Sequence, residues 1–279
     1  NTAVGFRSGF TTTGAGNTAI GYQVGGNKTT ESQSVMIGYQ AGQTANADSG
    51  SNAVLIGYQA GRKLYAGSGD NIAIGHLAMG AGSRHSAGSD KNIAIGSSAM
   101  AGVLASGSAH NVCIGYQALN AATSGAYNTV LGNYAGHDIT TAGYNTLIGY
   151  GTGSKLVTAT STNNQHNTFV GYVAGVLSTG YDNVIVGSEA GDALTTGNSN
   201  VVIGRNALST ATTANDCIII GRETGNAISA GVAATGVIAI GTSACNNISS
   251  TDANYTIGIG YGAAANVTSG QKNLAIGYA

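Results

Sequence analysis

The chain has 279 residues but no proline and no tryptophan, and only 10 basic and 11 acidic residues. Without proline a collagen-like triple helix is excluded, and the 46 glycines do not recur at every third position either. A hydrophobic content of 42% excludes the apolar-poor, highly charged composition of a disordered chain. With a net charge of −1 and no cluster of Lys and Arg, we expect no nucleic-acid partner.

Cysteine is scarce as well. Cys113, Cys217 and Cys245 lie far apart and have neither metal-ligand spacing nor a disulfide framework. Cys113 lies within an apolar run, where a thiol behaves as a small hydrophobic group. No run of about twenty apolar residues is present, so we predict no membrane insertion. The sequence begins at Asn1 and ends at Ala279 in mid-repeat, so residues 1–279 are interpreted as one tandem-repeat fragment of a longer fibre array.

What the sequence does contain is a repeat in which an aliphatic residue precedes glycine, at intervals of 16 to 22 residues. Its fullest form, N-T-A-I-G-Y-Q-V-G, spans Asn17–Gly25. The sixteen glycines that define the units are Gly5, Gly21, Gly38, Gly57, Gly75, Gly96, Gly115, Gly132, Gly149, Gly171, Gly187, Gly204, Gly221, Gly241, Gly260 and Gly277. This recurrence predicts an all-β parallel solenoid of about 16 coils.

The residues before each glycine predict a strand that is apolar on both faces. Ile, Val or Leu precedes the glycine, and a residue that is almost always β-branched stands two positions earlier. The position between them is mostly apolar as well, as at Met36 and Phe169. Side chains alternate between the two faces of a strand, so one face would fill the solenoid and the other would need a second covering. Neighbouring subunits of an oligomer are the simplest source of that covering.

The remaining positions predict turns and columns of like residues. The glycine marks a bend where a side chain would clash or φ would be unusual, and a small residue such as Ala41 follows three positions later. Coils stack about 4.8 Å apart, so equivalent residues form columns, and uncharged columns avoid repulsion between like charges. A tyrosine column for offset stacking comprises Tyr22, Tyr39 and Tyr58. An asparagine column of hydrogen-bonded amides comprises Asn71, Asn92, Asn111, Asn128, Asn145, Asn167, Asn183 and Asn200.

The N-T-A-I-G pattern, with its downstream small residue and Gly-containing loop, resembles the head repeats of YadA-type trimeric autotransporter adhesins. Units reading N-T-A-I-G-Y-Q-A-G are also similar to repeats of bacteriophage tail fibres. This resemblance covers essentially the whole chain and implies a left-handed β-roll, a side-by-side homotrimer and a rigid adhesive fibre. The units are longer and more variable than the adhesin repeat, and no coiled-coil heptads or anchor lie within them, which favours a phage or secreted fibre over an autotransporter head.

The charged residues and histidines are interpreted as structural. The one local concentration of charge comprises Glu189, Asp192, Arg205, Arg222 and Glu223, for which salt bridges are favoured over a catalytic or glycan-binding patch. The five histidines occupy differing positions in their units and are interpreted as solvated loop residues in preference to metal ligands: His76, His85, His110, His137 and His166. Asp70–Asn71 is only weakly similar to a calcium-binding repeat loop, which needs glycine and aspartate at fixed spacing in every unit. We therefore expect no enzyme activity, no metal and no cofactor.

Two groups of loop residues are candidates for contact or modification. The longest intervals between glycines place Arg84, His85, Gln165 and His166 in the loops expected to project furthest, as receptor contacts. Four N-glycosylation sequons begin at Asn27, Asn247, Asn254 and Asn266. Chance explains them in a chain so rich in Asn, Thr and Ser, unless the protein is secreted through a glycosylating pathway.

Together these features predict a structural fibre segment: a stiff spacer whose loops attach to a cell-surface glycan or protein receptor. The expected self-association is a homotrimer, and the expected location is extracellular, on a virion or on a cell surface. A self-assembling filament whose chains stack end to end is the second hypothesis. An ice-binding solenoid is the third, weakened because threonine alternates with Val and Ile in the relevant column. A glycan-active enzyme comes last, for want of a carboxylate cluster.

Overall fold

The computed structural model of this protein is all β, and no helix occurs among the residues that it describes. The described residues are 1–9, 14–26, 32–43, 51–64, 68–80, 88–105, 107–156, 165–228, 233–249, 254–268 and 270–279. The chain forms two compact units, Asn1–Tyr144 and Asn145–Ala279.

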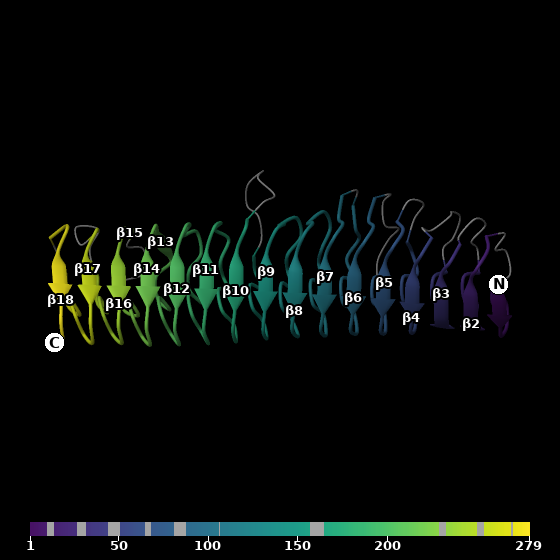
Figure 1. The fold of residues 1–279 in the computed structure, drawn as a ribbon, viewed down its shortest axis with the longest axis horizontal. Coiled ribbons are helices and arrows are strands. Elements are labelled where there is room, and N and C mark those ends of the chain that lie inside the picture. Colours follow the sequence, from purple (N-terminus) through teal and green to yellow (C-terminus); the bar gives the residue numbers. More distant parts are fainter. Residues whose placement is uncertain are drawn as a thin grey trace. The chain divides into compact units, whose positions relative to one another are not determined.

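In the first unit, eight short strands form a parallel sheet in sequence order, and each strand pairs with the strand of the next repeat (Figure 1). The register joins equivalent residues, so that Gly21 pairs with Gly38 and Tyr22 with Tyr39. The strands are β1 (Thr2–Val4), β2 (Thr18–Tyr22), β3 (Val35–Tyr39), β4 (Val54–Ile56), β5 (Ile72–Ile74), β6 (Ile93–Ile95), β7 (Val112–Ile114) and β8 (Thr129–Leu131).

The second unit repeats this arrangement with eight strands of its own, again parallel and in sequence order. These strands are β9 (Thr146–Ile148), β10 (Thr168–Val170), β11 (Val184–Val186), β12 (Val201–Ile203), β14 (Ile218–Ile220), β16 (Ile238–Ile240), β17 (Ile257–Ile259) and β18 (Leu274–Ile276). Two further strands, β13 (Thr213–Asn215) and β15 (Ala233–Thr235), pair in parallel with each other just before β14 and β16.

The predicted parallel β-solenoid is confirmed, with about 14 turns in place of the 16 coils expected. All sixteen repeat units do form a strand in the described part of the chain. The left-handed twist and the homotrimer, which the family resemblance implies, stay predictions.

The second residue of each strand faces the interior of its turn, and it is buried in every strand from β2 to β17. Met36, Leu55 and Phe169 are among the largest fully buried side chains, and the alanine three positions after the glycine is buried at Ala41 and its equivalents. A third buried column, seven residues after the glycine, includes Leu64 and is contributed by the loops. Burying large apolar side chains stabilises each turn by roughly 1.5–3 kcal/mol per side chain.

The repeat glycines are required by two facts of geometry, as the sequence predicted. Gly115 has a φ of +142°, a region that residues with a side chain rarely adopt. A Cβ atom on Gly115 would lie 2.4 Å from the carbonyl oxygen of Gly132 in the next turn. The same contact recurs at Gly21, whose added Cβ would lie 1.9 Å from the carbonyl oxygen of Gly38. The glycines thus let successive turns approach at the corner where each strand ends.

Candidate functional site: the exposed strand face

The outer face of each sheet carries two apolar columns that no described residue covers. One column is the residue before each glycine and the other lies two residues earlier, on the opposite side of the strand from the buried central residue. Ile20, Ile114 and Ile203 of the first column are 38–40% exposed. The prediction that the strands are apolar on both faces is therefore confirmed. Parallel sheets are normally covered on both sides, so this face is the principal candidate interaction surface.

Stacked rings follow the C-terminal ends of the strands, one position after the glycine. Tyr22 and Tyr39 stack with ring centroids 5.0 Å apart, and Tyr39 and Tyr58 with centroids 5.2 Å apart. The structure extends the predicted column to Phe6 and His76 at its two ends. In the second unit the pairs Tyr150–Tyr172 and Tyr261–Tyr278 stack in the same way. These tyrosines are 40% exposed or more, so the column forms one rim of the apolar face.

A ladder of glutamine amides lies directly after the tyrosine column. Gln40 Nε2 donates to Gln23 Oε1 at 2.9 Å, and Gln59 Nε2 donates to Gln40 Oε1 at 2.8 Å. All three glutamines have a left-handed φ between +51° and +54°. The recurring Y-Q pair in the repeat was the sequence signal for this ladder, which sequence reasoning missed.

The opposite rim, at the N-terminal ends of the strands, contains a second aromatic column that the sequence analysis did not predict. His110 stacks on Tyr127 with centroids 4.9 Å apart, and Tyr127 stacks on Tyr144 at 4.8 Å. Each occupies the position five residues before the repeat glycine, with a φ of +59° to +61°. In the second unit the same position holds the exposed residues Asp182 and Asp216. The two rims of the face therefore differ in chemistry.

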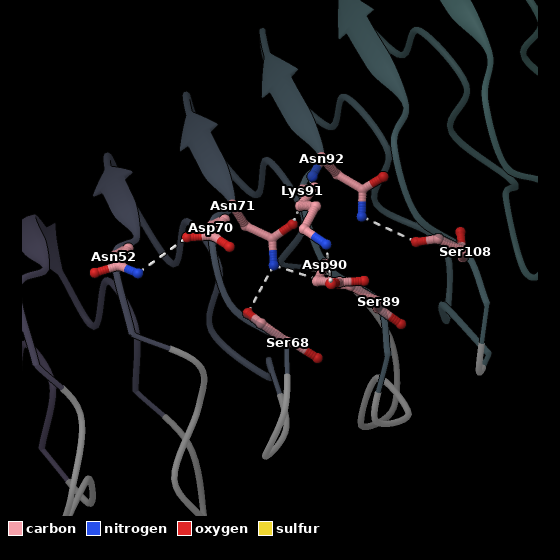
Figure 2. A network of polar contacts seen from close by, with 9 residues as sticks. All are labelled: Asn52, Ser68, Asp70, Asn71, Ser89, Asp90, Lys91, Asn92 and Ser108. Carbon is pink, nitrogen blue, oxygen red and sulfur yellow. Dashed lines mark hydrogen bonds and ion pairs between the residues drawn. The ribbon is translucent and has the colours of Figure 1, made fainter.

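The asparagine column is buried in both units, with all eight predicted side chains at most 1% exposed. Asn71 Nδ2 donates to the carbonyl oxygens of Ser68 at 2.7 Å and Ser89 at 2.9 Å, and Asn92 Nδ2 donates to the carbonyl oxygen of Ser108 (Figure 2). The backbone N–H of Asn92 in turn donates to Asn71 Oδ1 at 2.9 Å. The expected bonds between neighbouring amides are present in part, as from Asn111 Nδ2 to Asn92 Oδ1. These asparagines thus tie the start of a strand to the loop that follows it and to the start of the next strand, and Asn71 also bonds to its own preceding loop.

Three of the five charged residues in this concentration, Arg205, Arg222 and Glu223, form ion pairs, as the sequence analysis favoured. Arg205 Nη2 lies 3.3 Å from Glu223 Oε1, and Arg222 Nη1 lies 3.4 Å from the same oxygen. The two arginines occupy the tyrosine position at the C-terminal rim and are more than half exposed. Asp192 is different, because burial raises the pKa of its carboxyl group, an effect that a hydrogen bond from Ala193 opposes. Its Oδ1 is buried with no hydrogen-bond partner.

The histidines are dispersed, and the described residues contain no group of three or more His, Cys, Asp or Glu side chains that could hold a metal ion. His76 and His110 belong to the two aromatic columns, and His137 Nδ1 lies 2.5 Å from Asp138 Oδ1. His166 is exposed, and His85 lies outside the described residues.

The sequence predicted that Gln165 and His166 are exposed receptor contacts, and the structure agrees for only one of these two residues. His166 is exposed, but the expectation that Gln165 projects from the surface is wrong. Gln165 is 3% exposed, and its Nε2 donates to the carbonyl oxygen of Thr179 in the next turn at 3.2 Å. Gln165 lies three residues before β10 and two residues before Asn167 of the buried asparagine column. Arg84, like His85, lies outside the described residues.

The sequons differ in accessibility. Asn266 is exposed, whereas Asn247 and Asn254 are half-buried and Asn27 lies outside the described residues. Asn254 Oδ1 also accepts a hydrogen bond from the backbone N–H of Thr235 at 3.0 Å. Of the three described sequons, Asn266 therefore offers the most accessible amide.

All three cysteines are buried and unpaired with one another. Burial raises the pKa of Cys113 far above its usual range, and it raises the pKa of Cys217 and of Cys245 to about 11. Such thiols remain protonated near neutral pH and act as core hydrophobic groups.

Comparisons with known proteins gave no match, so the functional argument rests on the fold and on the exposed strand face. No protein-family model, curated protein or solved structure matches the chain. Within the part of the chain that the structure describes, no helix has the length and apolar character needed to span a membrane.

Proposed function

We propose that this chain is a structural fibre segment that associates side by side with copies of itself and presents its loops to a cell-surface receptor. The observation that carries the proposal is the two-column, mainly apolar face, which follows the strands of both units and is half-exposed or exposed. A parallel sheet with one uncovered apolar face is incomplete as a monomer, because burial of apolar area contributes about 25 cal/mol per Å².

The repeat itself supports the structural part of the proposal. Equivalent residues pair from turn to turn, and the asparagine hydrogen bonds and the close approach at the repeat glycines recur. The sheet can therefore grow by adding similar turns. Loops attached to each turn would give many weak contacts, and association of several chains would multiply them. The family resemblance favours three copies and an extracellular setting on a phage or bacterial surface.

Sedimentation equilibrium of the chain and two matched double variants tests the association. Ile114→Lys with Ile203→Lys places two charges on the apolar face, at residues 40% and 38% exposed. Val103→Lys with Leu177→Lys places the same charges on loop residues of equal exposure, 39% and 38%. We expect the wild type and the loop variant to form the same oligomer and the face variant to be monomeric.

A monomeric wild type at micromolar concentration would overturn the proposal. Equal association of the two variants would also overturn it, because the oligomer would then use another surface. Far-ultraviolet circular dichroism of each variant confirms that the strands remain formed.

A further inference from the structure

In the turns of β11, β12 and β14, two arginines lie on one rim of the apolar face and two aspartates lie on the other. Arg205 and Arg222 follow the C-terminal ends of β12 and β14, and their side chains are 57% and 56% exposed. Asp182 and Asp216 precede β11 and β14 at the N-terminal rim and are exposed as well. Within the described residues neither aspartate side chain makes a hydrogen bond or an ion pair, whereas both arginines share the single carboxylate of Glu223. In these turns the C-terminal rim thus carries two arginines beside the carboxylates of Glu189 and Glu223, and the N-terminal rim carries two unpaired carboxylates.

Symmetry determines which rims meet when two copies cover each other's face. Under a rotation axis parallel to the direction of stacking, the C-terminal rim of one copy meets the N-terminal rim of the next at the same turn. Under an axis parallel to the strands, the two C-terminal rims meet and the stacking direction reverses, so arginine lies against arginine when the axis passes through the turns of β12 and β14. β11, β12 and β14 are consecutive strands (Figure 1), so the charged positions fall within three successive turns about 4.8 Å apart.

The residues at the two rims are compatible at each turn under the first arrangement. In the turn of β14, Arg222 of one copy meets Asp216 of the other, and Arg205 lies one turn from both Asp182 and Asp216. In the turn of β17, the exposed rings of Tyr261 and Tyr255 meet. The second arrangement instead places like charges together, which costs affinity and disfavours that partner geometry.

We propose that a second copy of this chain docks on the strand face in parallel and turn matched to turn, with Arg222 of one copy pairing with Asp216 of the next and Arg205 lying one turn from both Asp182 and Asp216. This inference rests on the proposed self-association and specifies its geometry. The apolar columns supply most of the binding free energy, and the charged rims select the parallel register.

Charge reversal and charge exchange test the pairing. Arg205→Glu with Arg222→Glu should weaken association roughly tenfold or more, because acid then faces acid across each contact. Adding Asp182→Arg and Asp216→Arg to the same chain exchanges the charges between the rims and should restore the wild-type dissociation constant. Lys63→Glu with Lys155→Glu is the matched control, since it reverses two cations six residues after a repeat glycine, away from both rims.

Sedimentation equilibrium at about 0.1 M salt measures the three variants, with circular dichroism to confirm folding. Unchanged association of the arginine variant, or failure of the exchange variant to recover, would overturn the pairing while leaving the proposed function intact. A monomeric wild type would overturn both.

Disulfide trapping reads the geometry directly. In the double variant Arg222→Cys and Asp216→Cys, the two thiols of one chain are separated by a strand of about 20 Å, too far for an internal disulfide. Oxidation should therefore link different chains, while the single variant Arg222→Cys should remain unlinked. Covalent dimers of that single variant would show that like rims meet, and would overturn the parallel arrangement. The three native cysteines are buried and do not compete.

Discussion

The backbone N–H of Asn128 donates a hydrogen bond of 2.9 Å to Oδ1 of Asn111, one turn earlier in the chain. Asn128 Nδ2 also donates to Asn111 Oδ1, and Asn111 Nδ2 donates to the carbonyl oxygen of Gly125. One buried side chain therefore satisfies the start of the next strand and the end of the intervening loop. The column of asparagines closes each turn because an amide is both donor and acceptor.

Replacing Asn111 with alanine should lower the free energy of unfolding by about 1–3 kcal/mol, because it leaves the buried N–H of Asn128 without its acceptor. Asn111→Asp should cost more, since a carboxylate cannot donate to Gly125 and would be buried as a charge. Urea unfolding followed by circular dichroism measures both. Asn120→Ala is the control: this half-buried side chain donates only to the carbonyl oxygen of Ser98, and its loss should be smaller. Equal losses of unfolding free energy at the two positions would contradict a special role for the hydrogen bonds of Asn111.

Gly115→Ala should lower the unfolding free energy by more than the cost of its positive φ alone, which is about 1–3 kcal/mol. The added methyl group would overlap the carbonyl oxygen of Gly132, so adjacent turns must separate. Gly107→Ala provides the comparison, because Gly107 has a φ of +90° and no atom within 4 Å of an added Cβ. Thermal unfolding of the two variants separates the clash from the backbone strain, and similar midpoints would exclude the clash as a determinant.

Asp192→Asn should raise the thermal midpoint near neutral pH. Burial raises the pKa of Asp192 in the folded protein, so the folded state resists ionisation. Its contribution is most favourable below the ordinary aspartate pKa and is lost as the pH rises through the folded pKa. The asparagine amide does not ionise, so the variant does not lose this stability at neutral pH. The difference in thermal midpoint between the variant and the wild type should therefore shrink as the pH falls to acid values. A difference in midpoint that is independent of pH would contradict the assignment to ionisation.

The native protein should not react with an aromatic disulfide reagent at pH 8, because all three thiols are buried and their pKa values are raised. Three thiols should react once the chain is unfolded in denaturant. Rapid reaction of any cysteine under native conditions would show that a turn opens readily near Cys113, Cys217 or Cys245.

The sequence predicted the strands well because each depends on residues adjacent in the chain. The β-branched pair and the glycine that follows are local signals, and the tyrosine and asparagine columns follow once the period is known. Sequence reasoning did not predict the glutamine ladder, the His110–Tyr127–Tyr144 column or buried loop residues such as Leu64, although each recurs at a fixed distance from the glycine. The glutamines were visible in the Y-Q pair of the repeat. The aromatic column and Leu64 flank loops whose lengths differ between units, and Gln165 was placed wrongly because it lies at the end of such a loop.

By itself the sequence determined the repeat, the parallel strands and a second apolar face, since these follow from side-chain alternation and period. Only the tertiary structure decided how the asparagines bond, because their partners are main-chain groups of the loop and of the next turn. It also decided that the two ends of each strand form distinct rims on one exposed face. That face arises from stacking residues about eighteen positions apart, and the stacking brings scattered arginines and aspartates to opposite edges of a single surface.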